Sequence, residues 1–184
     1  MVFLRLSACN LRCPFCDTDF SASREMTAAE IVNALLSVTP SSGRVCITGG
    51  EPALQLDSPL IDALHEADFR IHLETNGTRA LPAGIDWITL SPKEDFAPHA
   101  QVVLPKADEL KLVYTGLNDP EKWLGFPAAH YFLQPCDPGE ICPADGGHHL
   151  LPEAVDTTAA TLRYILSHPR WRLSLQTHKI LGIA

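Results

Sequence analysis

Short runs of β-branched, aliphatic and aromatic residues alternate with helix-like segments along almost the whole of this 184-residue chain. Runs of this kind, bounded by Gly, Pro or Asn, predict strands at residues 2–7, 44–48, 70–74, 87–91, 109–114, 130–134 and 172–177. Alternating strands and helices are typical of a mostly parallel sheet with helices packed outside it. We therefore predict an α/β fold, and the length favours a single domain over residues 1–184.

Three helix starts can be recognised from their capping residues. Thr27 and Glu30 form a capping-box pattern, in which each side chain can bond the backbone N–H of the other residue. Ser58, directly before a proline, is the expected N-cap of a second helix. Asp156 or Thr157 is expected to cap a third. A short helical turn is expected within residues 118–124.

The polar motifs of the chain follow the predicted strands. Since the carboxyl ends of parallel strands meet at one edge of a sheet, side chains placed there converge. The motifs in this position are residues 49–51, 74–77, 91–93, 134–135 and 176–179, together with the segment after residue 7. The pattern therefore predicts one site at this edge of the sheet.

Composition excludes several classes of protein. The net charge of −8 and the pI of about 5.4 argue against a broad nucleic-acid-binding surface. No apolar run approaches the roughly 18 residues that span a bilayer, and the first residues lack a signal-peptide pattern. Cysteines grouped in such a chain indicate metal binding or redox chemistry and not disulfides. We expect a cytoplasmic protein.

The cysteines are concentrated in the stretch Cys9-Asn-Leu-Arg-Cys13-Pro-Phe-Cys16. A structural zinc site needs a fourth ligand, and the next cysteine, Cys46, lies in an apolar run and is interpreted as core. A [4Fe–4S] cluster usually takes four thiolates, so three would leave one iron open to a small molecule. The spacing favours a cluster, and zinc remains the alternative.

The CxxxCxxC spacing, with Phe15 before the last cysteine, resembles the cluster motif of radical S-adenosylmethionine (SAM) enzymes. Thr48-Gly49-Gly50-Glu51-Pro52 is similar to their GGE motif. The two glycines allow a backbone to approach a ligand closely, and Glu51 can accept from an ammonium group. This resemblance implies a partial, open (β/α) barrel of the radical SAM type, in which SAM chelates the open iron.

Seven fragments, in order along the chain, resemble the 7-carboxy-7-deazaguanine synthase family. They are residues 16–20, 48–52, 74–77, 86–93, 109–113, 132–135 and 171–179. The resemblance implies conversion of 6-carboxy-5,6,7,8-tetrahydropterin to 7-carboxy-7-deazaguanine and ammonia, in the 7-deazapurine route to queuosine. It also implies a [4Fe–4S] cluster, SAM that is regenerated, Mg²⁺, a flavodoxin-like electron donor and a homodimer.

The resemblance also implies roles for individual residues. The cluster ligands are Cys9, Cys13 and Cys16, and Thr18 is the Mg²⁺ ligand. The residues that contact SAM are Phe15, Asp17, Gly50, Ser91, Pro92, Lys93, Gln134, Pro135, Cys136 and Asp137. The residues that contact the substrate are Arg5, Thr48, His178 and the terminal carboxylate of Ala184.

Two features depart from the family pattern, and two other functions remain open. The family carries a substrate-binding segment before the first strand, which we expect to be absent here, leaving the pocket open. Residues 136–153 contain Cys142, His148 and His149 and are interpreted as a loop, not a second metal site. The alternatives are another radical SAM enzyme, such as a glycyl-radical activase, and a non-catalytic iron–sulfur or zinc module.

Overall fold

The computed structural model describes residues 1–19, 24–39, 43–137 and 156–182. Its centre is one seven-stranded sheet whose strands lie in chain order, and every pairing between them is parallel. The strands are β1 (Val2–Leu6), β2 (Arg44–Gly49), β3 (Arg70–Thr75), β4 (Trp87–Leu90), β5 (Ala107–Tyr114), β6 (Ala128–Pro135) and β7 (Trp171–Leu173). The predicted α/β class with a parallel sheet is confirmed.

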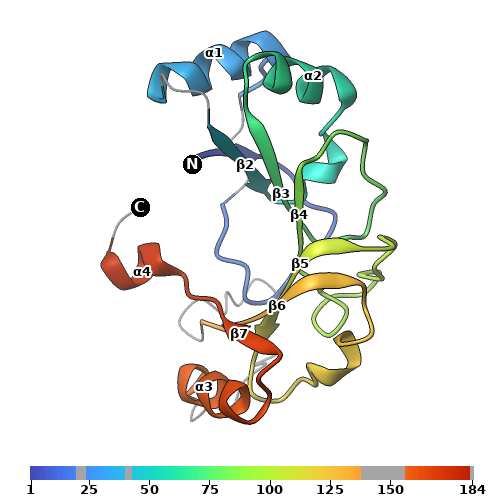
Figure 1. Ribbon diagram of the computed structural model, residues 1–184, viewed down its shortest axis with the longest axis vertical. Coiled ribbons are helices and arrows are strands. Elements are labelled where there is room, and N and C mark those ends of the chain that lie inside the picture. Colours follow the sequence, from blue (N-terminus) through green and yellow to red (C-terminus); the bar gives the residue numbers. More distant parts are fainter. Residues whose placement is uncertain (20–23, 40–42, 138–155, 183–184) are drawn as a thin grey trace.

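The sheet is curved and open, with its longer helices outside (Figure 1). The helices are α1 (Ala28–Val38), α2 (Ser58–Glu66), α3 (Thr157–Ser167) and α4 (Thr177–Leu181), with 3₁₀ turns η1 (Pro52–Leu54) and η2 (Glu121–Trp123). Helices α1 and α2 lie outside the β1–β3 end, and α3 lies outside the β6–β7 end. Strands β1 and β7 are the two edges and do not pair, so the predicted open barrel is confirmed.

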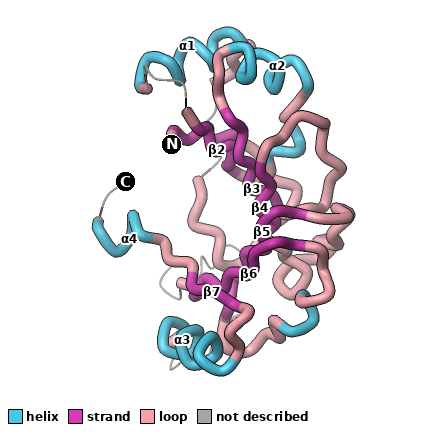
Figure 2. The backbone as a smooth tube through the Cα atoms, in the orientation of Figure 1, coloured by secondary structure: helices cyan, strands magenta, loops and turns pink. Residues whose placement is uncertain are grey.

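The core lies between the convex face of the sheet and the helices. Val45 and Ile47 of β2 and Ile71 of β3 are fully buried against leucines of α1 and α2. Burial of each such side chain contributes roughly 1.5–3 kcal/mol. Because side chains alternate along a strand, every second residue of β2, such as Thr48, faces the concave side. Figure 2 shows the segment after β1 crossing that concave side.

Most helix starts agree with the sequence predictions, with one correction. The capping box of Thr27 and Glu30 is present, and Asp156 caps α3. The N-cap of α2 is Asp57 and not Ser58, because the Asp57 carboxylate accepts a hydrogen bond from the Leu60 N–H at 3.0 Å. The prediction was therefore one residue late. The turn expected within residues 118–124 is η2.

The seventh strand is shorter than predicted. Strand β7 ends at Leu173, opposite Leu133 of β6, and the Ser174 N–H makes the last bond to the Leu133 carbonyl oxygen. The chain then leaves the sheet and forms α4, which the sequence analysis did not predict. Residues 176–179 therefore lie at the start of a short helix and not at a strand end.

Some predictions concern segments outside the described residues. Residues 138–155 and Ala184 are among these, so the interpretation of the loop at 136–153 and the role of the terminal carboxylate stay predictions. In the part of the chain that is described, no helix has the length and apolar character needed to cross a membrane.

Candidate active site

A cavity of about 1120 Å³ opens on the concave side, at the carboxyl ends of the strands. Every residue to which the resemblance assigns a cluster, Mg²⁺, SAM or substrate role lines this cavity, with the exception of Pro92 and Ala184; Glu51, expected to accept from an ammonium, does not line it either. Pro92 is buried beside it, and Ala184 lies outside the described residues. The expected convergence of motifs from five strands therefore holds, although no ligand role of a single residue is tested by it.

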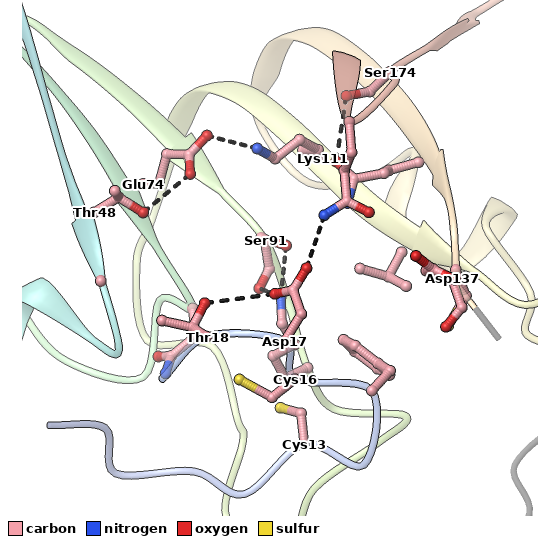
Figure 3. Close-up of a pocket in the computed structure, with 18 of the residues that line it drawn as sticks. Cys13, Cys16, Asp17, Thr18, Thr48, Glu74, Ser91, Lys111, Asp137 and Ser174 are labelled. Atoms are coloured by element: carbon pink, nitrogen blue, oxygen red, sulfur yellow. Dashed lines mark hydrogen bonds and ion pairs between the residues drawn. The ribbon is translucent and has the colours of Figure 1, made fainter. Parts of the chain in front are cut away.

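The three thiols of the triplet line the cavity, and Figure 3 shows two of them, Cys13 and Cys16, close to each other. Cys9 and Cys13 are partly buried, Cys16 is exposed, and the Cys16 N–H donates to the Cys13 carbonyl oxygen at 3.1 Å. Burial raises the pKa of the Cys13 thiol to about 11, against a smaller opposing effect of the Lys93 ammonium. Burial also raises the pKa of the Cys9 thiol. Without a metal Cys9 and Cys13 therefore stay protonated at neutral pH, so iron binding must displace their protons.

The thiols suit a cluster better than a single ion. A zinc ion holds its thiolates about 2.3 Å away and therefore draws them together. Among the described residues, no three Cys, His, Asp or Glu side chains are grouped in this way. A [4Fe–4S] cluster instead takes each thiolate on a different iron. Three thiols on one loop can each bind a different iron of a cluster, and this grouping does not test the zinc alternative.

Glu51 has a structural role that the sequence analysis did not expect. Its side chain is fully buried and accepts hydrogen bonds from the Thr75 hydroxyl at 2.7 Å and the Asn76 N–H at 2.6 Å. It also accepts from the Ala53 N–H at 3.0 Å. Both oxygens accept hydrogen bonds from the protein, and Glu51 is not among the residues that line the cavity, so its contact with a ligand ammonium stays a prediction. It ties the end of β2 to the end of β3.

The glycines before Glu51 have a structural reason as well. A Cβ on Gly50 would lie 1.9 Å from the Ala8 carbonyl oxygen, and one on Gly49 would lie 1.9 Å from that of Leu6. Gly49 also has a φ of +139°, which side chains disfavour. The two glycines let the segment that carries Cys9 pack directly on β2. Close approach of the protein backbone to a ligand, as expected from the sequence, is therefore not the only reason for glycine at these two positions.

A charged pair occupies the opposite wall of the cavity (Figure 3). The Lys111 ammonium lies 2.6 Å from Glu74 Oε1, and the Thr48 hydroxyl donates to Glu74 Oε2 at 3.2 Å. Burial alone would raise the pKa of Glu74, but the Lys111 charge and hydrogen bond hold it below its usual value. The cavity thus presents an ionised carboxylate at neutral pH.

Sequence reasoning missed the roles of Glu74 and Lys111. Glu74 belonged to a motif noted only for its position, and Lys111 was not singled out. A signal existed: Lys111 lies between Leu110 and Leu112, two buried residues of β5. A charged residue in such a run must face the opposite side of the sheet, and in a curved sheet that side is the concave face.

A second ammonium lies nearer the thiols. The partly buried Lys93 donates to the carbonyl oxygen of Ser91 at 2.7 Å and to its hydroxyl oxygen. Burial lowers the pKa of Lys93 to about 8, and the charge of Lys111 acts in the same direction. Phe15 and Phe96 meet edge-to-face beside Cys136, with ring centroids 4.8 Å apart. An anionic group and a flat apolar group can both be accommodated here.

Comparison with known proteins agrees with this architecture. Residues 5–96 match the model of the radical SAM superfamily. In structure, the chain is similar to QueE from Escherichia coli (TM-score 0.61, 23% identity, 95% of this chain and 84% of that chain). It is also similar to Streptococcus suis SuiB bound to S-adenosylmethionine (TM-score 0.60, 16% identity, 95% and 49%). At these identities the structural likeness shows the fold alone. The sheet, the cysteine loop and the family match define a radical SAM enzyme, which uses a [4Fe–4S] cluster and SAM.

The sequence relatives narrow the class further. A 7-carboxy-7-deazaguanine synthase of Bacteroides thetaiotaomicron is 44% identical over 182 residues, covering 99% of this chain and 87% of that protein. Its counterpart from Bradyrhizobium diazoefficiens is 41% identical over 203 residues, covering 99% and 89%. The chain belongs to the 7-carboxy-7-deazaguanine synthase family of radical SAM enzymes.

Proposed function

We propose that this chain converts 6-carboxy-5,6,7,8-tetrahydropterin to 7-carboxy-7-deazaguanine with release of ammonia, in the 7-deazapurine route to queuosine. The product is the one named for its relatives. The observation that carries the proposal is that three thiols and a set of charged groups suited to a polar, anionic substrate line the same cavity. A glycyl-radical activase would act on a protein, for which a cavity of this kind is not needed.

The cofactors have candidate ligands on the same loop. Cys9, Cys13 and Cys16 would hold the cluster, and the Thr18 hydroxyl, which also lines the cavity, is a suitable hard ligand for Mg²⁺. When bound, the reduced cluster and SAM supply the 5′-deoxyadenosyl radical that takes a hydrogen atom from the substrate. Phe15, Asp17 and Lys93 would position SAM beside the thiols.

Arg5 is proposed to bind the substrate carboxylate. Arg5 lies on β1, in register with Thr48 of β2, and its side chain lines the cavity. A guanidinium can bind a carboxylate through two parallel hydrogen bonds. Glu74 would accept hydrogen bonds from N–H groups of the pterin ring, and Lys111 keeps Glu74 ionised for that purpose. The two charges would fix the orientation of the ring.

Binding of the pterin acid tests this assignment of substrate class. Arg5→Met should weaken binding to the anaerobic, cluster-loaded protein at least about tenfold, and Arg5→Lys should weaken it less. Tetrahydropterin without the carboxylate should bind wild type and Arg5→Met equally weakly. If the substitution weakened both ligands to the same extent, Arg5 would not recognise the carboxylate and the proposed substrate would lose its support.

The charged Lys93 should lower the free energy of unfolding of the cluster-free protein near neutral pH. Its folded pKa of about 8 lies below the value of 10.5 for a free lysine, so the unfolded chain binds the proton more tightly. The cost is therefore complete below pH 8 and disappears as the pH rises to 10.5. Lys93→Met should raise the free energy of unfolding by about 3 kcal/mol at pH 7 and by less than about 1 kcal/mol at pH 10.

Urea unfolding at both pH values measures this difference. Lys106→Met, at an exposed lysine, is the matched control and should change little at either pH. A gain for Lys93→Met that did not depend on pH would contradict the account. The expected result would support the idea that Lys93 is kept, although it lowers stability, because its ammonium binds an anion. The carboxylate of SAM is the candidate for this anion.

The electron donor and the oligomeric state remain predictions. We propose a flavodoxin-like protein as the donor, because the cluster must be reduced by one electron before it can act on SAM. We also propose a homodimer and a single radical SAM domain over residues 1–184. Sedimentation of the reconstituted protein tests the dimer, and reduction by a flavodoxin in place of dithionite tests the donor.

A further inference from the structure

Helix α4 is held in place without a core of its own. None of its five residues is buried, and the side chains of Ile180 and Leu181 are 66% and 64% exposed. A helix of this length is not stable by itself in water. It nevertheless lies at the open side of the curved sheet (Figures 1 and 2), and three of its residues, Thr177, His178 and Lys179, line the cavity. Polar contacts must therefore hold it there.

Lys179 provides the main contacts. Its ammonium lies 2.7 Å from Asp17 Oδ2 and 3.1 Å from Asp137 Oδ2. Asp17 directly follows the cluster cysteine Cys16, whereas Asp137 follows β6. The Gln176 side-chain amide also donates to Asp17, at 3.0 Å. One ammonium on α4 thus joins Asp17 and Asp137, two cavity residues that are far apart in the sequence and are both labelled in Figure 3.

These contacts are partly shielded from water. The side chains of Lys179, Asp17 and Asp137 are 24%, 31% and 39% exposed, so the three charges are less screened than a pair on the open surface. Burial alone would raise the pKa of Asp17, but hydrogen bonds from Lys179 and Gln176 lower it below its usual value.

The contacts of Lys179 also affect its neighbour in the sequence, His178. His178 is exposed at the protein surface but lines the cavity, and its position depends on that of α4. We propose that Lys179 is a positioning residue, which pairs with Asp17 and Asp137 at once and so fixes α4 and His178 at the rim of the substrate cavity. The effect on the pterin rests on the proposed function, but the fixing of α4 does not.

Hydrogen exchange of the cluster-loaded protein tests the fixing of α4 without any substrate. In Lys179→Met, amides of α4 should exchange at least about fivefold faster than in wild type, with iron content unchanged. Lys179→Arg should restore most of the protection, because a guanidinium can also bridge two carboxylates. Lys106→Met, at an exposed lysine before β5, is the matched control.

Steady-state kinetics test the consequence for the substrate. Lys179→Met should raise the KM for the pterin about tenfold while kcat falls less than about threefold, because binding is weakened more than the chemical step. Lys179→Arg should restore the KM. Unchanged exchange in Lys179→Met, an Arg variant as defective as the Met variant, or loss of iron would each overturn the proposal. If wild type made no 7-carboxy-7-deazaguanine while α4 still loosened in Lys179→Met, the proposed function would fail and the fixing role of Lys179 would stand.

Discussion

Cys13→Ala should abolish turnover, with a loss of product formation of at least about a thousandfold. Each of the three thiols is expected to hold a different iron, so removal of one leaves the cluster incomplete. Burial raises the pKa of the Cys13 thiol to about 11, so Cys13 becomes a thiolate at neutral pH only when iron binds it. Iron and sulfide analysis after anaerobic reconstitution measures the loss directly.

Cys46→Ala is the matched control for this experiment. Cys46 is also buried, as the sequence analysis expected, but it lies in β2 and outside the cysteine loop. Its substitution should leave the iron content near the wild-type value and reduce stability by about 1–2 kcal/mol. A Cys13→Ala protein that kept a full complement of iron, or a Cys46→Ala protein that lost it, would refute the assignment of the ligands.

Glu74→Gln should lower kcat/KM for the pterin about 100-fold. The amide is the same size as the carboxylate but lacks the charge that Lys111 maintains, and it presents an N–H₂ group where an acceptor is expected. The iron content should be unchanged, and SAM should still be cleaved slowly. Product formation and release of 5′-deoxyadenosine, measured together, separate the two effects.

Two further variants complete this test. Lys111→Met should also impair turnover, because it leaves Glu74 partly buried without its counterion. Glu66→Gln, at an exposed residue of α2, should have no effect. Wild-type kcat/KM in Glu74→Gln would show that the charged pair is structural and does not contact the substrate.

Local signals carried most of the prediction of the fold. The strands and the capping box of Thr27 were recognisable because alternation and capping depend on residues close in the sequence. The cysteine loop was recognisable for the same reason. By contrast, β7 was extended too far because the end of a strand depends on its partner, here Leu133 of β6.

The contents of the site were predicted less completely, for a physical reason. The hydrogen bonds of Glu51 with Thr75 and Asn76 were not predicted, because these partners lie more than 20 residues away and become visible only in the folded chain. Lys179 joins Asp17 to Asp137 over a still larger separation. Contacts between distant segments are set by topology, and no local pattern encodes them.

Anaerobic turnover with a count of SAM molecules tests the central claim most directly. Cluster-loaded protein, SAM, Mg²⁺, dithionite and 6-carboxytetrahydropterin are combined, and products are followed by mass spectrometry. The account predicts many molecules of 7-carboxy-7-deazaguanine for each SAM lost, because SAM is regenerated. Protein with an intact cluster that cleaves SAM but forms no 7-carboxy-7-deazaguanine would contradict it.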